Sequence, residues 1–233
     1  MNIFNNSECI CCGNKSSIFQ VCPECQNNFL SINFDFPRCN NCGKTLISED
    51  ELCSECKENS VLVSCDSVFP IFSYMIWKKD LLFLWKMEGK RFFAFFFAKK
   101  IYEVYKRKYD SLPIVPVPPR PKKIWNTGWD QINDVKNILH IFYKIPVINL
   151  LQRTEKGQQK KRSRQERLNH RGADYLFHPK KISSNKGGKA TIPEEVVLID
   201  DILTTGVTLE TCARILKENG VKKVHAITVF IAE

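Results

Sequence analysis

The stretch that decides the fold runs from Val196 to Thr208 and reads VVLIDDILTTGVT. It opens with four consecutive aliphatic residues, a run too short for a helix and typical of a strand buried on both faces, as in a parallel sheet. We expect this strand to stop at Asp200 and Asp201, at the edge where open α/β sheets bind their ligands. The following LETCARILKENG predicts a helix, because its apolar residues recur on one face and Asn219-Gly220 can end it.

The loop between this strand and this helix has the chemistry of an anion site. Free backbone N–H groups and the helix dipole attract a phosphate there, and hydroxyl groups and a glycine assist them. Asp200 and Asp201 would suit the paired hydroxyls of a ribose, or a hydrated Mg²⁺. Together these features indicate a ribose 5-phosphate site, and the alternative is an ordinary solvated strand, turn and helix. The loop residues are Thr204, Thr205, Gly206, Val207 and Thr208.

The segment IDDILTTGVT resembles the phosphoribosyl pyrophosphate (PRPP) motif of type I phosphoribosyltransferases. That resemblance implies that Asp200 and Asp201 bind the ribose 2′- and 3′-hydroxyls, that residues 204–208 wrap the 5-phosphate, and that Mg²⁺ accompanies PRPP. It also implies an α/β fold with a parallel sheet flanked by helices. Where the 6-oxopurine enzymes carry an acid used as a general base, this chain has Thr204. The motif therefore indicates the sugar and leaves the acceptor open.

Cysteines dominate the first sixty residues. Eight of them form a repeated CxxC pattern, in which CICCGNKSSIFQVCPEC and CNNCGKTLISEDELCSEC align with a single insertion. Two CxxC pairs can supply four thiolates to one tetrahedral metal, so sequential pairing predicts two structural Zn²⁺ ions. An interleaved arrangement, in which the first and third pairs share a metal, stays open. The predicted ligands are Cys9, Cys12, Cys22, Cys25, Cys39, Cys42, Cys53 and Cys56.

Other uses of these cysteines fit less well. An odd total of 11 cysteines in a cytosolic chain disfavours a disulfide scaffold, and no strand–helix context surrounds the CxxC pairs as a redox centre requires. Units this small cannot bury a core and depend on metal for folding. We therefore expect a double zinc-ribbon domain over residues 1–60 and a phosphoribosyltransferase-like domain over residues 61–233.

The overall composition points to a cytoplasmic protein with anionic partners. The net charge of +10 favours phosphates or nucleic acid, or simply a solvated basic surface. We find no secretory signal at the start of the sequence. Charged residues such as Lys86 interrupt the most hydrophobic segment, so we expect no membrane span. Further elements are expected as a strand over 66–72, one or two helices over 80–106 meeting near Gly89, an extended run over 112–118, a helix from Trp129, a strand over 145–151 and a closing strand containing a structural His225.

The segment VPVPPRPKKIWNTGWDQ identifies a closer resemblance, to the ComF family. ComF proteins are phosphoribosyltransferase-like, begin with cysteine ribbons and are linked to DNA uptake and competence. The match is partial, because Lys123 stands where the family has arginine, Thr127 replaces a second arginine and Asp130 replaces asparagine, while Gln131 is kept. Losing guanidinium groups weakens bidentate anion binding. Lys123 is our best candidate for a catalytic contact to pyrophosphate.

The most basic part of the chain is Arg153 to Arg171, which reads RTEKGQQKKRSRQERLNHR. It suits a loop that closes over the reacting centre, a contact with a nucleic-acid backbone, or a solvated loop. Gln159, Arg167 and Asn169 approximate a pattern of the ComF family. Two functions therefore stay open. One is glycosyl transfer from PRPP to an unknown acceptor. The other is a non-catalytic accessory protein of transformation that binds single-stranded DNA, with the PRPP site as a regulatory or vestigial site.

Overall fold

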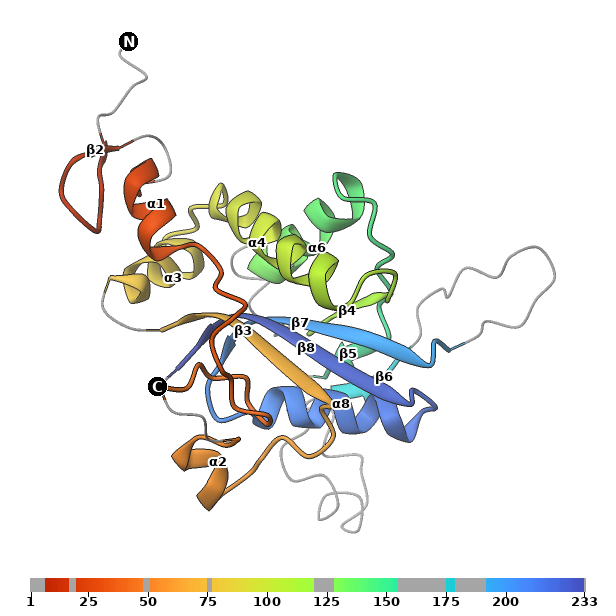
Figure 1. Ribbon diagram of the computed structural model, residues 1–233. Helices are drawn as coiled ribbons and strands as arrows, with labels where there is room; N and C mark the ends of the chain where they lie inside the picture. Colours follow the sequence, from red (N-terminus) through yellow and green to blue (C-terminus); the bar gives the residue numbers. More distant parts are fainter. Residues whose placement is uncertain are drawn as a thin grey trace.

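The computed structural model describes residues 7–16, 20–47, 51–74, 77–119, 128–154, 175–178 and 192–232. Within these ranges the centre of the molecule is a four-stranded sheet with the order β3-β8-β7-β4, in which all neighbours are parallel. The strand that carries the two acids, β7, lies between β8 and β4 (Figure 1). The strands are β3 (Ser67–Ser73), β4 (Ile114–Pro116), β7 (Glu195–Leu203) and β8 (Lys223–Ile231).

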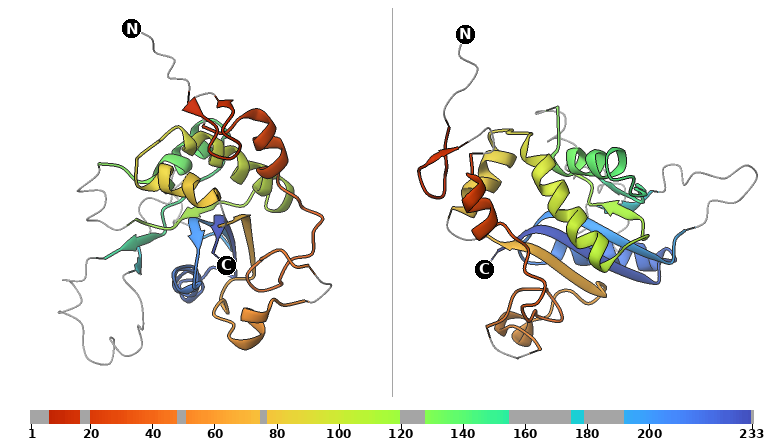
Figure 2. Two further views of the ribbon diagram at one scale, coloured as in Figure 1. Left: turned by 90° about the vertical axis from the view of Figure 1, so that its left-hand side faces the viewer. Right: turned by 45° about the horizontal axis from the view of Figure 1, so that its top comes forward.

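Helices cover both faces of this sheet, as Figures 1 and 2 show. One face carries α3 (Lys78–Lys86), α4 (Phe93–Lys108) and α6 (Gln131–Ile141), and the other carries α8 (Val207–Glu218). Gly89, with φ +66°, lies between α3 and α4, so the two-helix alternative for this segment is confirmed. The predicted class, a parallel sheet flanked by helices, is confirmed.

Two hydrophobic cores follow from these layers. The α4-side core includes Trp85, Phe97, Ile199 and Phe230. The α8-side core includes Leu198, Cys212, Leu216 and Val224. Neighbouring β7 residues enter different cores because successive side chains of a strand point to opposite faces. This is why four aliphatic residues in a row, all of them fully buried, form the middle of this sheet.

The expectation that β7 stops at its acids is wrong. The strand continues to Leu203, with Asp200 opposite Thr228 and Ile202 opposite Phe230 on β8. Two apolar side chains extend the pairing beyond the acids, because Ile202 packs against the α4-side core and Leu203 is buried in the α8-side core. The acids therefore lie within the strand and the loop begins at Thr204.

The two cysteine units lie on opposite faces of the sheet (Figure 1). The first contains β1 (Ser7–Glu8), β2 (Lys15–Ser16) and α1 (Pro23–Phe29), and its Val21 and Leu30 join Leu81 and Phe93 in the α4-side core. The second contains α2 (Ser54–Glu58), and its cysteines join the α8-side core together with Leu62. Each copy of the repeat thus packs against a different half of the molecule.

The predicted strand over 145–151 is displaced. The structure has β5 (Leu151–Arg153), antiparallel to β6 (Tyr175–Phe177), while residues 145–150 contribute only an isolated bridge between Val147 and Ile114. Pro146 has no backbone N–H, which limits regular pairing here. The predicted strand near 66–72, extended run over 112–118, helix after Trp129 and closing strand are confirmed. Among the helices that the structure describes, none has the length and apolarity to cross a bilayer.

Candidate functional site

The loop after β7 forms a small cup at the carboxyl end of the sheet. Gly206 adopts a left-handed conformation (φ +78°, ψ −13°) at the N-cap of α8 and supplies no side chain to the helix N-terminus. Asp200, Thr204, Gly206 and Thr208 line a small hollow that is open to solvent. Thr204 and Thr205 are exposed. The structure therefore brings Asp200 together with the threonine loop at a helix start, where backbone N–H groups can bind an anion.

The carboxylate of Asp201 lies outside this hollow. It is buried and accepts hydrogen bonds from Lys86 Nζ and from Gln131 Nε2, both at 2.6 Å. Lys86 comes from α3 and Gln131 from α6, so this network belongs to the opposite face of the sheet from α8. Of the two acids, Asp200 alone lines the hollow described above.

The surroundings of Asp200 disfavour the ionised form of its carboxyl group. Burial, and then the neighbouring carboxylate of Asp201, raise the pKa of Asp200 well above its usual range. The N–H of Asp201, which donates to Asp200 Oδ1 at 2.8 Å, and the charge of Lys86 only partly oppose this rise. A ligand that brings a hydroxyl donor or a cation to this carboxyl would relieve its unfavourable environment.

Sequence reasoning singled out Lys86 and Gln131 separately and missed that they meet on Asp201. They are 115 and 70 residues from it in the chain, and no pattern in the sequence links them. The departure at Asp130 is explained by its position. It is the N-cap of α6 and accepts from the N–H groups of Ile132 (3.0 Å) and Asn133 (3.1 Å), a task for which aspartate and asparagine are equally suited.

The eight predicted metal ligands form two clusters with sequential grouping. In each cluster all four sulfur atoms lie within 4.8 Å of one another. The sulfur atoms of Cys12 and Cys22 are 3.7 Å apart, as are those of Cys42 and Cys53. A tetrahedral site with Zn–S bonds of about 2.3 Å has sulfur–sulfur edges of about 3.8 Å, so the thiols fit zinc. The groups are Cys9, Cys12, Cys22 and Cys25, and Cys39, Cys42, Cys53 and Cys56.

Each cluster favours one thiolate at its first cysteine. Burial raises the pKa of Cys9, but backbone N–H groups, that of Cys22 foremost, outweigh burial and lower it to about 6. Cys39 has the same arrangement, with N–H groups of Cys42 and Cys53, and its pKa is also lowered to about 6. Burial raises the pKa of Cys56 to about 12. Four thiolates can therefore coexist only around a cation, which is the requirement of a metal site.

Comparison with known proteins agrees with this geometry. Residues 160–232 match the family model of the phosphoribosyl transferase domain. Competence protein ComFC of Streptococcus pneumoniae is 29% identical over 216 residues, which cover 90% of this chain and 86% of the relative. Competence protein F of Haemophilus influenzae is 27% identical over 237 residues, covering 97% and 96%. Over most of its length this chain is similar to competence proteins of the ComF type. The ComF resemblance of its sequence is thereby confirmed.

Among solved structures, a hypoxanthine phosphoribosyltransferase from Staphylococcus aureus is similar to this chain with a TM-score of 0.32 and 16% identity. The match covers 59% of this chain and 62% of the other. The fold class rests instead on the family match at 160–232 and on the parallel sheet itself.

Several predicted residues lie outside the described ranges. Lys123, the candidate for the pyrophosphate contact, is one of them. The basic run is described only at Arg153 and Thr154. The guanidinium of Arg153 lies 4.9 Å from the ring centroid of Tyr175 on β6. The remainder, including Gln159, Arg167 and Asn169, is outside the described ranges.

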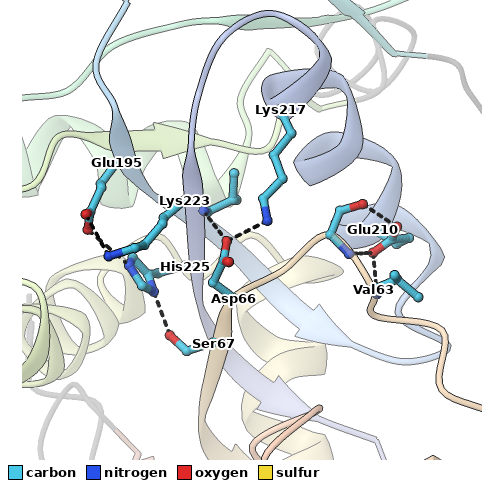
Figure 3. Close-up of polar contacts among 10 residues, drawn as sticks. Val63, Asp66, Ser67, Glu195, Glu210, Lys217, Lys223 and His225 are labelled. Carbon is cyan, nitrogen blue, oxygen red and sulfur yellow. Dashed lines mark hydrogen bonds and ion pairs between the residues drawn. The ribbon is translucent and has the colours of Figure 1, made fainter.

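His225, which was expected to be a structural residue, has three partners in the fold. Its ring stacks on Tyr109. Its Nδ1 is 2.8 Å from Ser67 Oγ, and its Nε2 is 3.6 Å from a carboxylate oxygen of Glu195 (Figure 3). These residues lie where β3, β7 and β8 begin, at the end of the sheet opposite the cup. The partners were missed because Ser67 and Glu195 reach His225 from neighbouring parallel strands that are distant in sequence.

Proposed function

We propose that this protein binds PRPP at the cup between β7 and α8 and transfers its phosphoribosyl group to an acceptor. The observation that carries the proposal is the meeting of Asp200 with Thr204, Gly206 and Thr208 in one hollow at a helix start. The N–H groups of the loop and the hydroxyls of residues 204–208 would bind the 5-phosphate. Asp200 would accept from a ribose hydroxyl, and this hydrogen bond would offset part of the burial that raises the pKa of its carboxyl.

In the proposed reaction the bond between ribose C1 and pyrophosphate breaks and a bond from C1 to the acceptor nucleophile forms. Mg²⁺ bound with PRPP would neutralise the departing pyrophosphate. Lys123 is proposed to contact that pyrophosphate. Asp201 can bind the ribose only if its carboxylate leaves Lys86 and Gln131. We therefore propose that its first role is to fix the end of β7 through these two hydrogen bonds.

The basic segment between β5 and β6 is proposed as a cover for this site. Tyr175 on β6 is buried in the same core as Cys212 of α8, so the antiparallel pair that flanks the segment lies beside the helix of the cup. Cations brought here would face a pyrophosphate leaving group, and closure would exclude water.

The cysteine clusters are proposed to hold two structural zinc ions, one in each unit, within a ribbon region over residues 1–60 that precedes a transferase unit over 61–233. The fit of four thiols to a tetrahedral ion supports this assignment. The names of the relatives support a role in competence.

The test is calorimetric titration of the chain with PRPP and MgCl₂. We expect stoichiometric binding, weakened at least about tenfold, or about 1.4 kcal/mol, in Asp200→Asn. Asp134→Asn is the matched control, because this carboxylate pairs with Arg91 on the surface and should leave binding unchanged. Absence of binding in the wild-type chain would exclude the proposal. Pyrophosphate release on adding nucleobases or amines would identify the acceptor class.

A second function, binding of single-stranded DNA, is favoured by the net charge of +10 and by the cations between residues 153 and 171. Phosphate contacts would make such binding fall steeply with salt. Retention of oligonucleotide by the wild-type chain, reduced on replacing Lys160, Lys161, Arg162 and Arg164 by glutamine, would support it. Unchanged retention in that variant would show that the basic segment between residues 153 and 171 does not bind the oligonucleotide.

A further inference from the structure

A short segment joins the second cysteine unit to the transferase sheet. We call residues 61–66, which lie between α2 and β3, the strap. It follows the side of α8, because its contacts reach the first turn of the helix at Glu210 and the last turn at Lys217. Figure 3 shows Val63 beside Glu210, and Asp66 beside Lys217. Asp66 also accepts from the N–H of Val224 at 2.8 Å, which ties that end of the strap to β8.

The other end of the strap is held by one carboxylate. Glu210 Oε2 accepts from the N–H groups of Val63 (2.8 Å) and Ser64 (2.7 Å), and its Oε1 accepts from Ser64 Oγ at 2.7 Å. Hydrogen bonds to an ionised acceptor are the stronger kind, and three of them here satisfy both oxygens. Glu210 is only four residues after Gly206 and its own N–H donates to Gly206 O at 2.9 Å. We call residues 204–208, the proposed binding site of the 5-phosphate, the phosphate loop. The carboxylate of Glu210 thus connects the strap to the helical turn that follows this loop.

The strap also packs against the loop itself. A Cβ atom built on Gly206 would lie 3.2 Å from two carbons of the buried Leu62 side chain and 3.6 Å from a Val61 methyl. Leu62 is therefore in close contact with the left-handed glycine at the helix start. A displacement of the strap would remove this contact and let the loop move.

The second cysteine unit controls the position of Leu62. Asn41, in the Cys39–Cys42 knuckle, donates from Nδ2 to Leu62 O at 2.7 Å, and its Oδ1 lies 3.5 Å from Cys56 Sγ of the same cluster. The knuckle is fixed to the sheet as well, since Gly43 passes so close to β3 that an added Cβ would lie 2.1 Å from Val68 O. A continuous series of contacts therefore runs from the second thiol cluster through Asn41 and Leu62 to Gly206.

The first cysteine unit provides the comparison. Its cysteines belong to the α4-side core, on the other face of the sheet, whereas Leu62 and Leu209 belong to the α8-side core with the second cluster. Where the second unit has Asn41, the repeat places Cys11. The two units share a sequence pattern, but contacts with the strap come from the second.

We propose that the strap is a positioning element for the phosphate loop, through which metal occupancy of the second thiol cluster sets the affinity of the loop for PRPP. The proposal rests on the proposed function for its ligand. With metal bound, the four thiols fix the knuckle and hold Asn41 against Leu62. Without metal the knuckle and strap loosen, so fewer molecules present the loop in its binding conformation, and the apparent affinity falls by that fraction.

The experiment combines amide hydrogen exchange over residues 206–211 of the free protein with calorimetric PRPP binding. Asn41→Ala and Glu210→Ala should each speed exchange there by roughly tenfold and weaken PRPP binding by a similar factor, because each breaks one link of the series. Glu218→Ala is the control on the same helix, since Glu218 pairs with Arg214 and does not touch the strap.

Metal loss is tested by matched double variants of the repeat. Cys53→Ser with Cys56→Ser should lower zinc content by one ion per chain and reproduce the Asn41→Ala behaviour. Cys22→Ser with Cys25→Ser should lose one ion and leave exchange at 206–211 unchanged. Equal effects of the two double variants, or wild-type exchange in both Asn41→Ala and Glu210→Ala, would overturn the proposal. Wild-type protein that binds no PRPP would refute the proposed function alone, because the exchange measurement still tests the strap.

Discussion

At the scale of single residues, Asp200 has a stability cost that its proposed role in ligand binding would explain. Its folded pKa is raised above the ordinary 3.8, so ionising Asp200 destabilises the native state once the pH exceeds 3.8. We predict that Asp200→Asn raises the unfolding free energy at pH 7, because the variant has no carboxyl group to ionise in this unfavourable environment. The gain should vanish as the pH falls to 3.8. Urea unfolding of both proteins across this pH range measures it.

The matched control for that prediction is Asp134→Asn, in which the carboxylate lost is paired with Arg91 at 2.7 Å. It should cost up to about 1 kcal/mol at pH 7, the opposite sign. If Asp200→Asn were destabilising at every pH, the carboxylate would be a structural acceptor and the idea of a strained binding residue would fail. Stabilisation together with lost PRPP affinity is the expected trade-off.

Candidate binding residues that lie close together in the chain could be predicted from the sequence. The threonine loop and the CxxC ligands are contiguous or periodic, so their spacing carries the information. The side-chain directions of Asp200 and Asp201 could not be predicted, because they depend on which helices cover each face. The network of Lys86 and Gln131 on Asp201, and the contacts of Glu210 with the strap, join residues that no spacing rule connects.

At the scale of elements, the two copies of the cysteine repeat differ in how tightly they dock. Gly13 and Gly43 both have positive φ, +75° and +73°. A Cβ on Gly13 would meet nothing within 4 Å, whereas one on Gly43 would lie 2.1 Å from Val68 O and 2.5 Å from Pro70 Cδ. We predict that Gly13→Ala costs about 1 kcal/mol of unfolding free energy and Gly43→Ala about 3 kcal/mol or more.

Thermal unfolding and release of zinc to a colorimetric chelator would measure both variants. Gly43→Ala should release one ion faster than the wild type, because its knuckle must move away from β3. Equal losses in the two variants would mean that the second unit does not need its close contact with the sheet. Such a result would also weaken the coupling assigned to the strap.

The type of each helix or strand was predictable because the spacing of apolar residues follows which side chains are buried. The ends of these elements were less predictable. The end of β7 was placed too early because two acids suggest a loop, while pairing with β8 and the burial of Leu203 extend the strand. The repeat could not predict that each cysteine unit packs on a different face of the sheet. It depends on apolar residues outside the CxxC pattern, such as Leu30 and Leu62.

At the scale of the whole molecule, the cysteine units complete both cores. Val21 and Leu30 of the first unit pack with Leu81 and Phe93, and the cysteines of the second unit pack in the α8-side core. Removing zinc with a strong chelator should therefore lower the melting temperature of the whole chain, with fluorescence and circular dichroism changing together. A transition confined to the first sixty residues would contradict this expectation.

The same packing predicts the behaviour of residues 61–233 expressed alone. This fragment keeps the phosphate loop and the sheet, but it uncovers Leu81 and Phe93 on one face and loses the partner of Leu62 on the other. Exposing two fully buried large side chains costs about 1.5–3 kcal/mol each, a large part of the marginal stability of a domain. We expect the fragment to unfold at lower urea concentration than the full chain and to aggregate on concentration. A fragment as stable as the full chain would mean that the cysteine units are an independent appendage, and the contacts across both cores would then contribute little.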